Sequence, residues 1–180
     1  FDALKKSDTD SKGKFVLERY VSAHSIIMSF EGIPTIYFNS LFGKSNDEAK
    51  YIITGNKRDV NRYKWNYKSI SKKLNNKNSK QSIFFQKISN LLSVRRKQKA
   101  FHPNASRRII NLGSKIFSFK RISIDRKQTI ICITNLSSIT QRTKLDKVYR
   151  NWNNLIGSKI QVNDNLLILK PFETIWLSNR

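Results

Sequence analysis

The stretch from Gly32 to Arg62 constrains the fold of this chain more than any other. It opens with an apolar run, Ile33–Phe38, and a short run of this kind predicts a buried strand in a parallel sheet. The polar loop that follows ends in five charged or amide side chains: Lys57, Arg58, Asp59, Asn61 and Arg62. Burying such groups in a core is unfavourable unless they form ion pairs or hydrogen bonds, or contact a ligand. Because α/β barrels build their sites at the carboxyl ends of strands, the loop is predicted to form half of a binding site.

A helix is predicted immediately before this strand. Phe15–Phe30 has a broad apolar face at helical spacing, and its polar residues Glu18, Arg19, Ser22 and Ser25 form only a narrow strip. Gly32 is the expected stop signal at the carboxyl end. A helix that leads through a short link into a strand is half of a repeating βα unit, which favours a parallel sheet with right-handed crossovers.

A second amphipathic helix is predicted over Ser82–Lys97, with Ser82 as its N-cap and basic residues in its last turn. A shorter helical patch is expected at Ser69–Leu74. The helical period ends near residue 105. Beyond that point short runs of β-branched and aromatic residues predict strands within 107–112, 115–124, 128–136, 147–152, 166–170 and 172–177, with a turn at Asn163–Asn165. The sequence therefore predicts an α/β part over residues 1–104 and an antiparallel β domain over residues 105–180.

Charge is the most prominent feature of the composition. The formal net charge is +23, and the segment Val60–Ile124 contains many lysines and arginines but no acid. A basic excess of this size suggests nucleic acid or an anionic surface as a partner. However, the cations are spread over several predicted elements, and no known nucleic-acid-binding motif accompanies them. A solvated surface in a chain of skewed composition is therefore favoured, and a nucleic-acid partner is unlikely.

Most catalytic constellations are excluded by the residues themselves. The histidines are His24 and His102, far apart, and the single Cys132 lies in an apolar strand pattern that predicts a buried thiol. No phosphate-binding glycine loop, nucleophile elbow or metal-ligand spacing is present, so no metal and no cofactor are expected. No apolar run reaches the ~20 residues of a membrane helix, and a soluble, cytoplasmic protein is expected. Because the chain begins at Phe1 and its one methionine is Met28, it is expected to be a piece of a longer protein.

Four separated motifs carry a resemblance to a known family. They are GIPTIYFNSLFGKSND at 32–47, KRDVNR at 57–62, RRKQKAFHPN at 95–104 and LKPFETIWL at 169–177. In this order they resemble the C-terminal part of the sucrose-phosphorylase-like branch of the α-amylase superfamily, which includes sucrose 6-phosphate and glucosylglycerate phosphorylases. The resemblance implies that the first part of the chain is the end of a (β/α)8 TIM barrel, with Phe15–Phe30, Ile33–Phe38 and Ser82–Lys97 as its last helix, strand and helix. A small C-terminal β domain would follow.

The same resemblance implies a function. Enzymes of this branch pass through a covalent glucosyl-enzyme, which phosphate attacks to give glucose 1-phosphate. Their catalytic carboxylates would lie upstream of residue 1, so no catalytic residue is expected in this chain. Arg58 matches the arginine that binds glucose hydroxyls, and Asp59, Asn61 and Arg62 match supporting positions of the same motif. The implied partners are a sugar substrate and inorganic phosphate.

Two other functions remain open at this stage. A hydrolase or transglycosidase of the same superfamily would differ only in the acceptor of the glucosyl group. A basic nucleic-acid-binding module is the less favoured alternative. The isolated chain is expected to be inactive and partly molten, with its stable part in the β domain, because a barrel strand without neighbours leaves unpaired edges.

Overall fold

The computed structural model describes residues 1–180 apart from residue 9, residues 158–159 and residues 164–165. Its α-helices precede its strands along the chain. The helices are α1 (Val16–Ser29), α2 (Glu48–Thr54), α3 (Tyr67–Asn75) and α4 (Lys80–Arg95). The strands are β1 (Ser106–Ile109), β2 (Ile116–Ile122), β3 (Thr129–Asn135), β4 (Gln141–Lys144), β5 (Asn153–Asn154), β6 (Gln161–Asn163), β7 (Leu166–Leu169) and β8 (Thr174–Ser178).

The strands form two antiparallel sheets. The larger sheet has the order β1-β2-β3-β8-β5, and the smaller one has the order β4-β7-β6. In the larger sheet Cys132 of β3 pairs with Phe119 of β2 on one side and with Trp176 of β8 on the other. Cys132 is buried as predicted, and burial raises the pKa of its thiol to about 12. The prediction of helices combined with an antiparallel sheet is thus confirmed.

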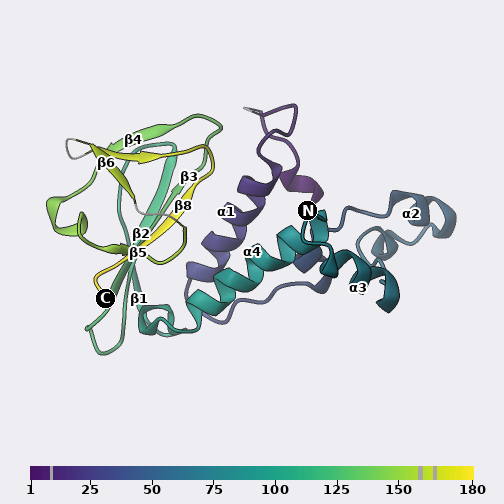
Figure 1. Ribbon diagram of the computed structural model, residues 1–180, viewed down its shortest axis with the longest axis horizontal. Coiled ribbons are helices and arrows are strands. Elements are labelled where there is room, and N and C mark those ends of the chain that lie inside the picture. Colours follow the sequence, from purple (N-terminus) through teal and green to yellow (C-terminus); the bar gives the residue numbers. More distant parts are fainter. Residues whose placement is uncertain (9, 158–159, 164–165) are drawn as a thin grey trace.

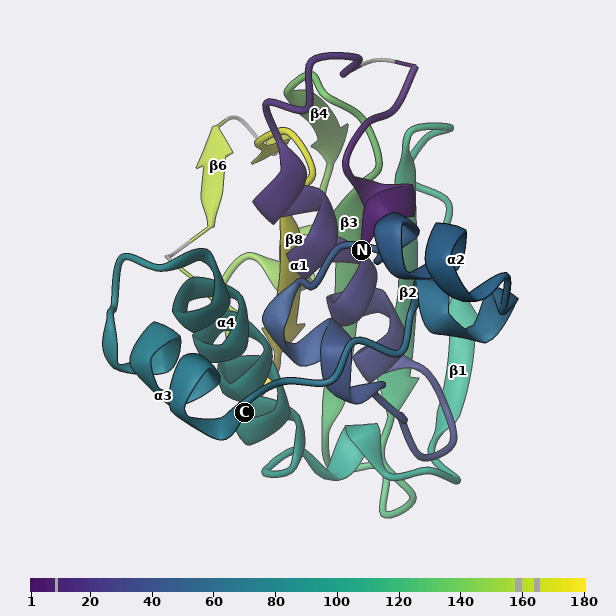
Figure 2. The same ribbon diagram turned by 90° about the vertical axis from the view of Figure 1, so that its right-hand side faces the viewer.

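Both faces of the larger sheet are covered, so three layers result. On one face Phe119, Ile130 and Trp176 share a core with α1 and α4. On the other face the sheet packs against Leu167 and Leu169 of β7. Figure 1 shows the sheets at one end of the molecule, α1 and α4 beside them, and α2 and α3 at the far end. Figure 2, viewed from that far end, shows α1 in front of β8, β3 and β2.

The predicted helix over Phe15–Phe30 is confirmed as α1, and most of its narrow polar strip is covered. Three of the four residues in that strip, Arg19, Ser22 and Ser25, are buried, whereas Ile27 is exposed. Arg19 forms a buried ion pair with Asp10 and also donates to backbone carbonyls of the first residues. The serine hydroxyl of Ser25 donates to the carbonyl of Val21 within the helix. Polar groups satisfied in this way can face a core.

Two buried arginines fasten the carboxyl end of α1 to the rest of the fold. Arg121 of β2 is 0% exposed and donates to the carbonyls of Ser29 (2.6 Å), His102 (2.8 Å) and Ala105 (3.1 Å). Arg95 of α4 donates to the carbonyls of Met28 and Gly32. Burial lowers the pKa of both guanidinium groups. Their positive charges suit this place, since the carboxyl end of a helix carries partial negative charge.

The strand predicted over Ile33–Phe38 is not formed among the described residues. This segment hydrogen-bonds to no strand among the described residues, and Ile33 is 84% and Phe38 56% exposed. An extended segment becomes a strand only beside another one, and the described part of the chain offers none here. Gly32 does not stop the helix either, because α1 ends at Ser29. Gly32 instead adopts a left-handed φ of 78° and donates its backbone N–H to Pro103.

Several boundaries and elements also differ from the predictions. The helix predicted over Ser82–Lys97 is present as α4, but its N-cap is Ser79, whose hydroxyl oxygen accepts from the backbone N–H of Ser82. The patch at Ser69–Leu74 is part of α3. The strand predicted over 147–152 is wrong, because Asp146 caps a 3-10 turn at Lys147–Tyr149. Strands β4, β5 and β6 were not predicted. The turn predicted at Asn163–Asn165 falls largely on residues outside the described ones.

The division into residues 1–104 and 105–180 stays a prediction. Helices lie before residue 105 and strands after it, yet one hydrophobic cluster includes side chains from both parts.

Candidate functional site

The segment that follows the exposed Ile33–Phe38 folds back on itself in two short turns. Asp47 caps α2 by accepting from the N–H of Lys50 (3.2 Å), and its own N–H donates to the carbonyl of Val60 (2.7 Å). Gly55 ends α2 with a left-handed φ of 65°. Asn56 then caps a 3-10 turn over Lys57–Val60 by accepting from the N–H of Arg58 (3.0 Å). The segment predicted as a polar loop therefore contains a short helix and a 3-10 turn, each held by a local cap.

One buried side chain holds the end of this segment in place. Asn39, 6% exposed, donates its amide N–H groups to the carbonyls of Asn61 (3.0 Å) and Tyr63 (3.1 Å). Its oxygen accepts from the indole N–H of Trp65 (2.8 Å). Asn39 lies in a 3-10 turn over Phe38–Phe42, and the hydroxyl of Tyr20 in α1 donates to that turn. Residues 61–65 are therefore fixed to α1 through Asn39.

A concave site of about 360 Å³ lies between the end of Ile33–Phe38 and the 3-10 turn over Lys57–Val60 with the residues that follow it. Its lining residues are Tyr37, Lys57, Arg58, Asn61 and Arg62. Three of the four site residues predicted from the sequence, Arg58, Asn61 and Arg62, therefore lie together. Lys57 belongs to the loop predicted as half of a site but was not among the four predicted substrate-binding residues, and Tyr37 was not predicted. A sequence signal for Tyr37 exists, since it lies near the end of the apolar run, where the chain turns into the polar loop.

The fourth predicted residue, Asp59, does not line this cavity. Its carboxylate pairs with the ammonium group of Lys50 at 3.3 Å rather than with Arg58. The pKa of Asp59 is lowered, first by a hydrogen bond from the Thr54 hydroxyl and further by Lys50, against the smaller opposing effect of burial. Asp59 is thus held as a carboxylate that connects α2 to the 3-10 turn.

The charge of the cavity is one-sided. Lys57, Arg58 and Arg62 contribute three cations, and no acid is among the residues that line it. A guanidinium group offers a planar set of donors that matches vicinal hydroxyls, a carboxylate or a phosphate. The arrangement can hold a polyhydroxylated or anionic ligand. It offers no carboxylate for acid–base or nucleophilic chemistry.

Among the described residues, no three His, Cys, Asp or Glu side chains come together as a metal site. Within the same residues, no helix has the length and apolar character needed to cross a bilayer.

The chain is similar to curated glucosylglycerate phosphorylases along nearly its whole length. It is 31% identical over 177 residues to the protein of Allomeiothermus silvanus and 28% identical over 180 residues to that of Escherichia coli. Each comparison covers 98% of this chain and 30% of the relative, so the chain spans about 30% of the length of these relatives. No protein-family profile matches the chain.

Solved structures of α-amylase-family enzymes have a similar fold. An α-amylase from Anoxybacillus matches with a TM-score of 0.67 and 16% identity, over 91% of this chain and 32% of that one. A trehalose-6-phosphate hydrolase from Bacillus licheniformis matches with a TM-score of 0.67 and 16% identity, over 96% and 40%. The resemblance predicted from the four motifs is confirmed: the sequence is similar to glucosylglycerate phosphorylases, and the fold is similar to that of α-amylase-family enzymes.

Proposed function

We propose that this chain forms the sugar-holding part of a glucoside phosphorylase, an enzyme that transfers a glucosyl group from a glucoside to phosphate. The observation that carries the proposal is the joint position of Arg58, Asn61 and Arg62 around one cavity, on the KRDVNR motif that resembles the phosphorylase branch. Similarity to glucosylglycerate phosphorylases over 98% of the chain supports it.

The architecture that goes with this function is the end of a (β/α)8 barrel followed by a β domain, with a division near residue 105. In this architecture α1, the extended Ile33–Phe38 and α4 are the last helix, strand and helix of the barrel. The exposure of Phe38 supports this assignment, because an apolar strand of a parallel barrel is covered on both faces. The catalytic carboxylates would come from other strands of the same barrel.

Within the cavity Arg58 has the central role. Its guanidinium group would bind sugar hydroxyls beside the bond that is broken, and Asn61 would add amide donor and acceptor groups. Lys57 and Arg62 suit an anionic group, such as the carboxylate of a glucosylglycerate or a phosphate. Asp59 has a supporting role, since its ion pair with Lys50 fixes the turn that carries Arg58.

The test joins residues 1–180 to the remaining part of a phosphorylase, which would supply the catalytic carboxylates. A chimera is made in which this chain replaces the matching 30% of the Allomeiothermus silvanus glucosylglycerate phosphorylase. We expect phosphate-dependent release of glucose 1-phosphate from the glucoside, whereas the chain alone is inactive. Release of free glucose at a rate independent of phosphate would instead identify a hydrolase, the alternative of the same superfamily.

Arg58→Ala in the chimera is expected to lower kcat/KM by about 10- to 100-fold, because a hydrogen bond from a charged group contributes about 1.5–3 kcal/mol. Arg142→Ala, at an exposed position of β4, removes the same charge elsewhere and serves as the matched control. Wild-type kinetics in Arg58→Ala would overturn the role of Arg58. Nuclear magnetic resonance of the 180-residue chain titrated with glucose 1-phosphate gives an independent test, with shifts expected at Arg58, Asn61 and Arg62.

A further inference from the structure

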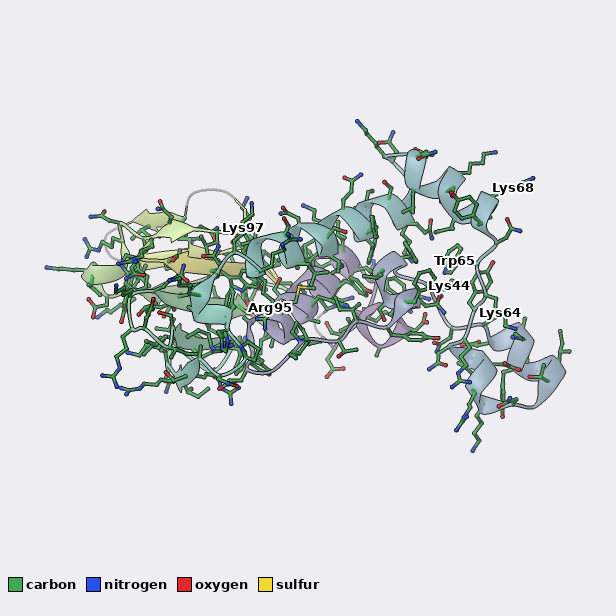
Figure 3. All side chains as sticks on the ribbon, turned by 90° about the horizontal axis from the view of Figure 1, so that it is seen from below. Lys44, Lys64, Trp65, Lys68, Arg95 and Lys97 are labelled. Atoms are coloured by element: carbon green, nitrogen blue, oxygen red, sulfur yellow. The ribbon has the colours of Figure 1, made fainter. Side chains whose placement is uncertain are left out.

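A second cavity lies away from the cavity of Arg58. It has a volume of about 700 Å³ and is formed where α4 ends, where β2 turns into β3 and where the extended segment begins. In Figure 3 Arg95 and Lys97, which line it, lie near the sheets, whereas Lys64, Trp65 and Lys68 lie at the opposite end of the molecule. A volume of this size is typical of sites for small organic molecules.

The walls of this cavity are joined by hydrogen bonds between different elements. The side-chain amide of Gln128, at the start of β3, donates to Gln98 (2.7 Å) and accepts from the backbone N–H of Ala100 (2.9 Å). Arg95 connects α4 to the carbonyl of Gly32 (3.1 Å), directly before the lining residue Ile33. Because three separate segments are bonded to one another, the cavity is a largely preformed site.

The lining of the cavity combines an apolar surface with unpaired positive charge. Ile33, Leu92, Phe101 and Ile124 contribute apolar side chains. Arg96 and Lys97 are exposed cations at the same cavity, and neither forms a salt bridge within the described part of the chain. An apolar ligand with one negative charge would satisfy both parts of this lining.

The one acid in the lining does not neutralise Arg96 and Lys97. The carboxylate of Asp125 accepts from the hydroxyl of Ser123 (2.6 Å) and the N–H of Lys127 (3.1 Å), and it pairs with Lys99 at 3.3 Å. The hydrogen bond from Ser123 is the largest of the effects that lower the pKa of Asp125 to about 2. Asp125 and Lys99 thus compensate each other, and the cavity keeps a net positive charge.

We propose that this cavity binds a small amphiphilic anion, an alkyl carboxylate or alkyl sulfate that is free in solution. The alkyl chain lies against Ile33, Leu92 and Ile124, and the anionic head group is held by Arg96 and Lys97. A neutral alcohol of the same length would keep the apolar contacts but lose the charge-assisted hydrogen bonds, which are the stronger polar contacts. An alkylammonium ion would meet repulsion.

The test is a titration of the 180-residue chain, followed by two-dimensional nuclear magnetic resonance. The probes are octanoate, octyl sulfate, octan-1-ol and octylammonium, all below their micelle concentrations. We expect saturable binding of octanoate and octyl sulfate with shifts at Ile33, Leu92 and Ile124. We expect octan-1-ol to bind about tenfold more weakly, since one hydrogen bond to a charged group contributes about 1.5 kcal/mol or more, and octylammonium not to bind.

Variants distinguish the contribution of the cationic residues of the cavity from that of the apolar residues. Arg96→Glu combined with Lys97→Glu is expected to weaken octanoate binding more than tenfold, with little effect on octan-1-ol. The matched control, Lys72→Glu combined with Lys73→Glu on α3, makes the same change in net charge and is expected to leave both affinities unchanged. Ile124→Ser is expected to weaken octanoate and octan-1-ol alike, because it removes apolar contact area. Circular dichroism verifies that each variant is folded.

Three results would overturn the proposal. The first is the absence of saturable binding by any anionic probe. The second is equal affinity for octanoate and octan-1-ol, which would remove the role of charge. The third is an equal loss of octanoate affinity in the α3 control, which would show that octanoate responds to the overall charge of +23 and not to this cavity.

Discussion

Two regions of this chain differ in which side chains they bury. In the sheet-backed region, which consists of α1, α4 and the two sheets, even arginine side chains such as Arg121 are fully buried. In the distal arm, residues 37–79, some large apolar side chains are exposed, with Ile52 at 80% and Ile53 at 84%. The difference shows that burial here follows the presence of a packing partner and not hydrophobicity alone.

The contrast also separates what holds each region together. The sheet-backed region has a continuous core, and its buried arginines donate to carbonyls of other elements. The distal arm depends on capping hydrogen bonds, on Asn39 and on a few aromatic contacts such as the stacked rings of Phe42 and Phe85. We therefore expect substitutions in the two regions to differ strongly in their effect on the free energy of unfolding.

The largest effect is expected for Arg121→Met. The substitution leaves the carbonyls of Ser29, His102 and Ala105 without their donors, and each buried unsatisfied group costs about 1–3 kcal/mol. We expect a loss of about 3 kcal/mol or more in the free energy of unfolding, measured by urea denaturation. Arg142→Met, at an exposed position of β4, is the control, with a change near zero. Equal stability of the two variants would contradict the comparison between the regions.

A smaller effect is expected where the two regions meet. Ser79→Ala removes the N-cap of α4, which accepts from the N–H of Ser82 at 3.1 Å, and a lost N-cap costs about 1 kcal/mol. Ser93→Ala lies on an exposed position inside the same helix and should be neutral or slightly stabilising. Thermal unfolding of both variants measures the difference, and an unchanged Tm for Ser79→Ala would show that α4 does not depend on its cap.

The buried His24 gives the sheet-backed region a pH dependence. Its Nδ1–H donates to the carbonyl of Tyr20 at 2.8 Å, and burial lowers its pKa below the usual value of 6.5. The unfolded chain then binds more protons than the folded one. The contribution of His24 to stability is complete above pH 6.5 and decreases as the pH falls below it. Urea denaturation between pH 7.5 and 5 should show this slope, and His24→Phe should reduce it.

The smallest effect on stability is expected for Ile52→Ser combined with Ile53→Ser. Both side chains are exposed on α2, so their removal takes little apolar area out of the folded core. We expect a change within about 0.5 kcal/mol in the free energy of unfolding, the range of ordinary surface substitutions. A large loss would mean that the arm has a core of its own, and the contrast between the two regions would disappear.

The sequence predicts the elements whose signals are local. The helical spacing of Phe84, Ile88 and Leu91 predicts α4, and the β-branched run around Cys132 predicts β3. Similar local patterns predict α1, α3 and β8. The joint position of Arg58, Asn61 and Arg62 also follows from their closeness in the sequence. These predictions succeed because each depends on residues a few positions apart.

Predictions failed where a distant partner decides the structure. Ile33–Phe38 has the composition of a strand, but strand pairing requires a neighbour. Tyr37 was missed at the site because only the folded chain brings it next to Arg58, 21 positions later. The strand predicted over 147–152 failed for a local reason, because the side-chain oxygen of the adjacent Asp146 caps a turn.

The three hydrogen bonds of Asn39 have a consequence for protein engineering. The shape of the KRDVNR motif at 57–62 is set partly by a residue 22 positions upstream of Asn61, and Trp65 completes that contact. A designer who grafts this motif onto another barrel must therefore transplant Asn39 and Trp65 along with it. A graft of residues 57–62 alone would carry the right donors on a loop that no longer presents them together.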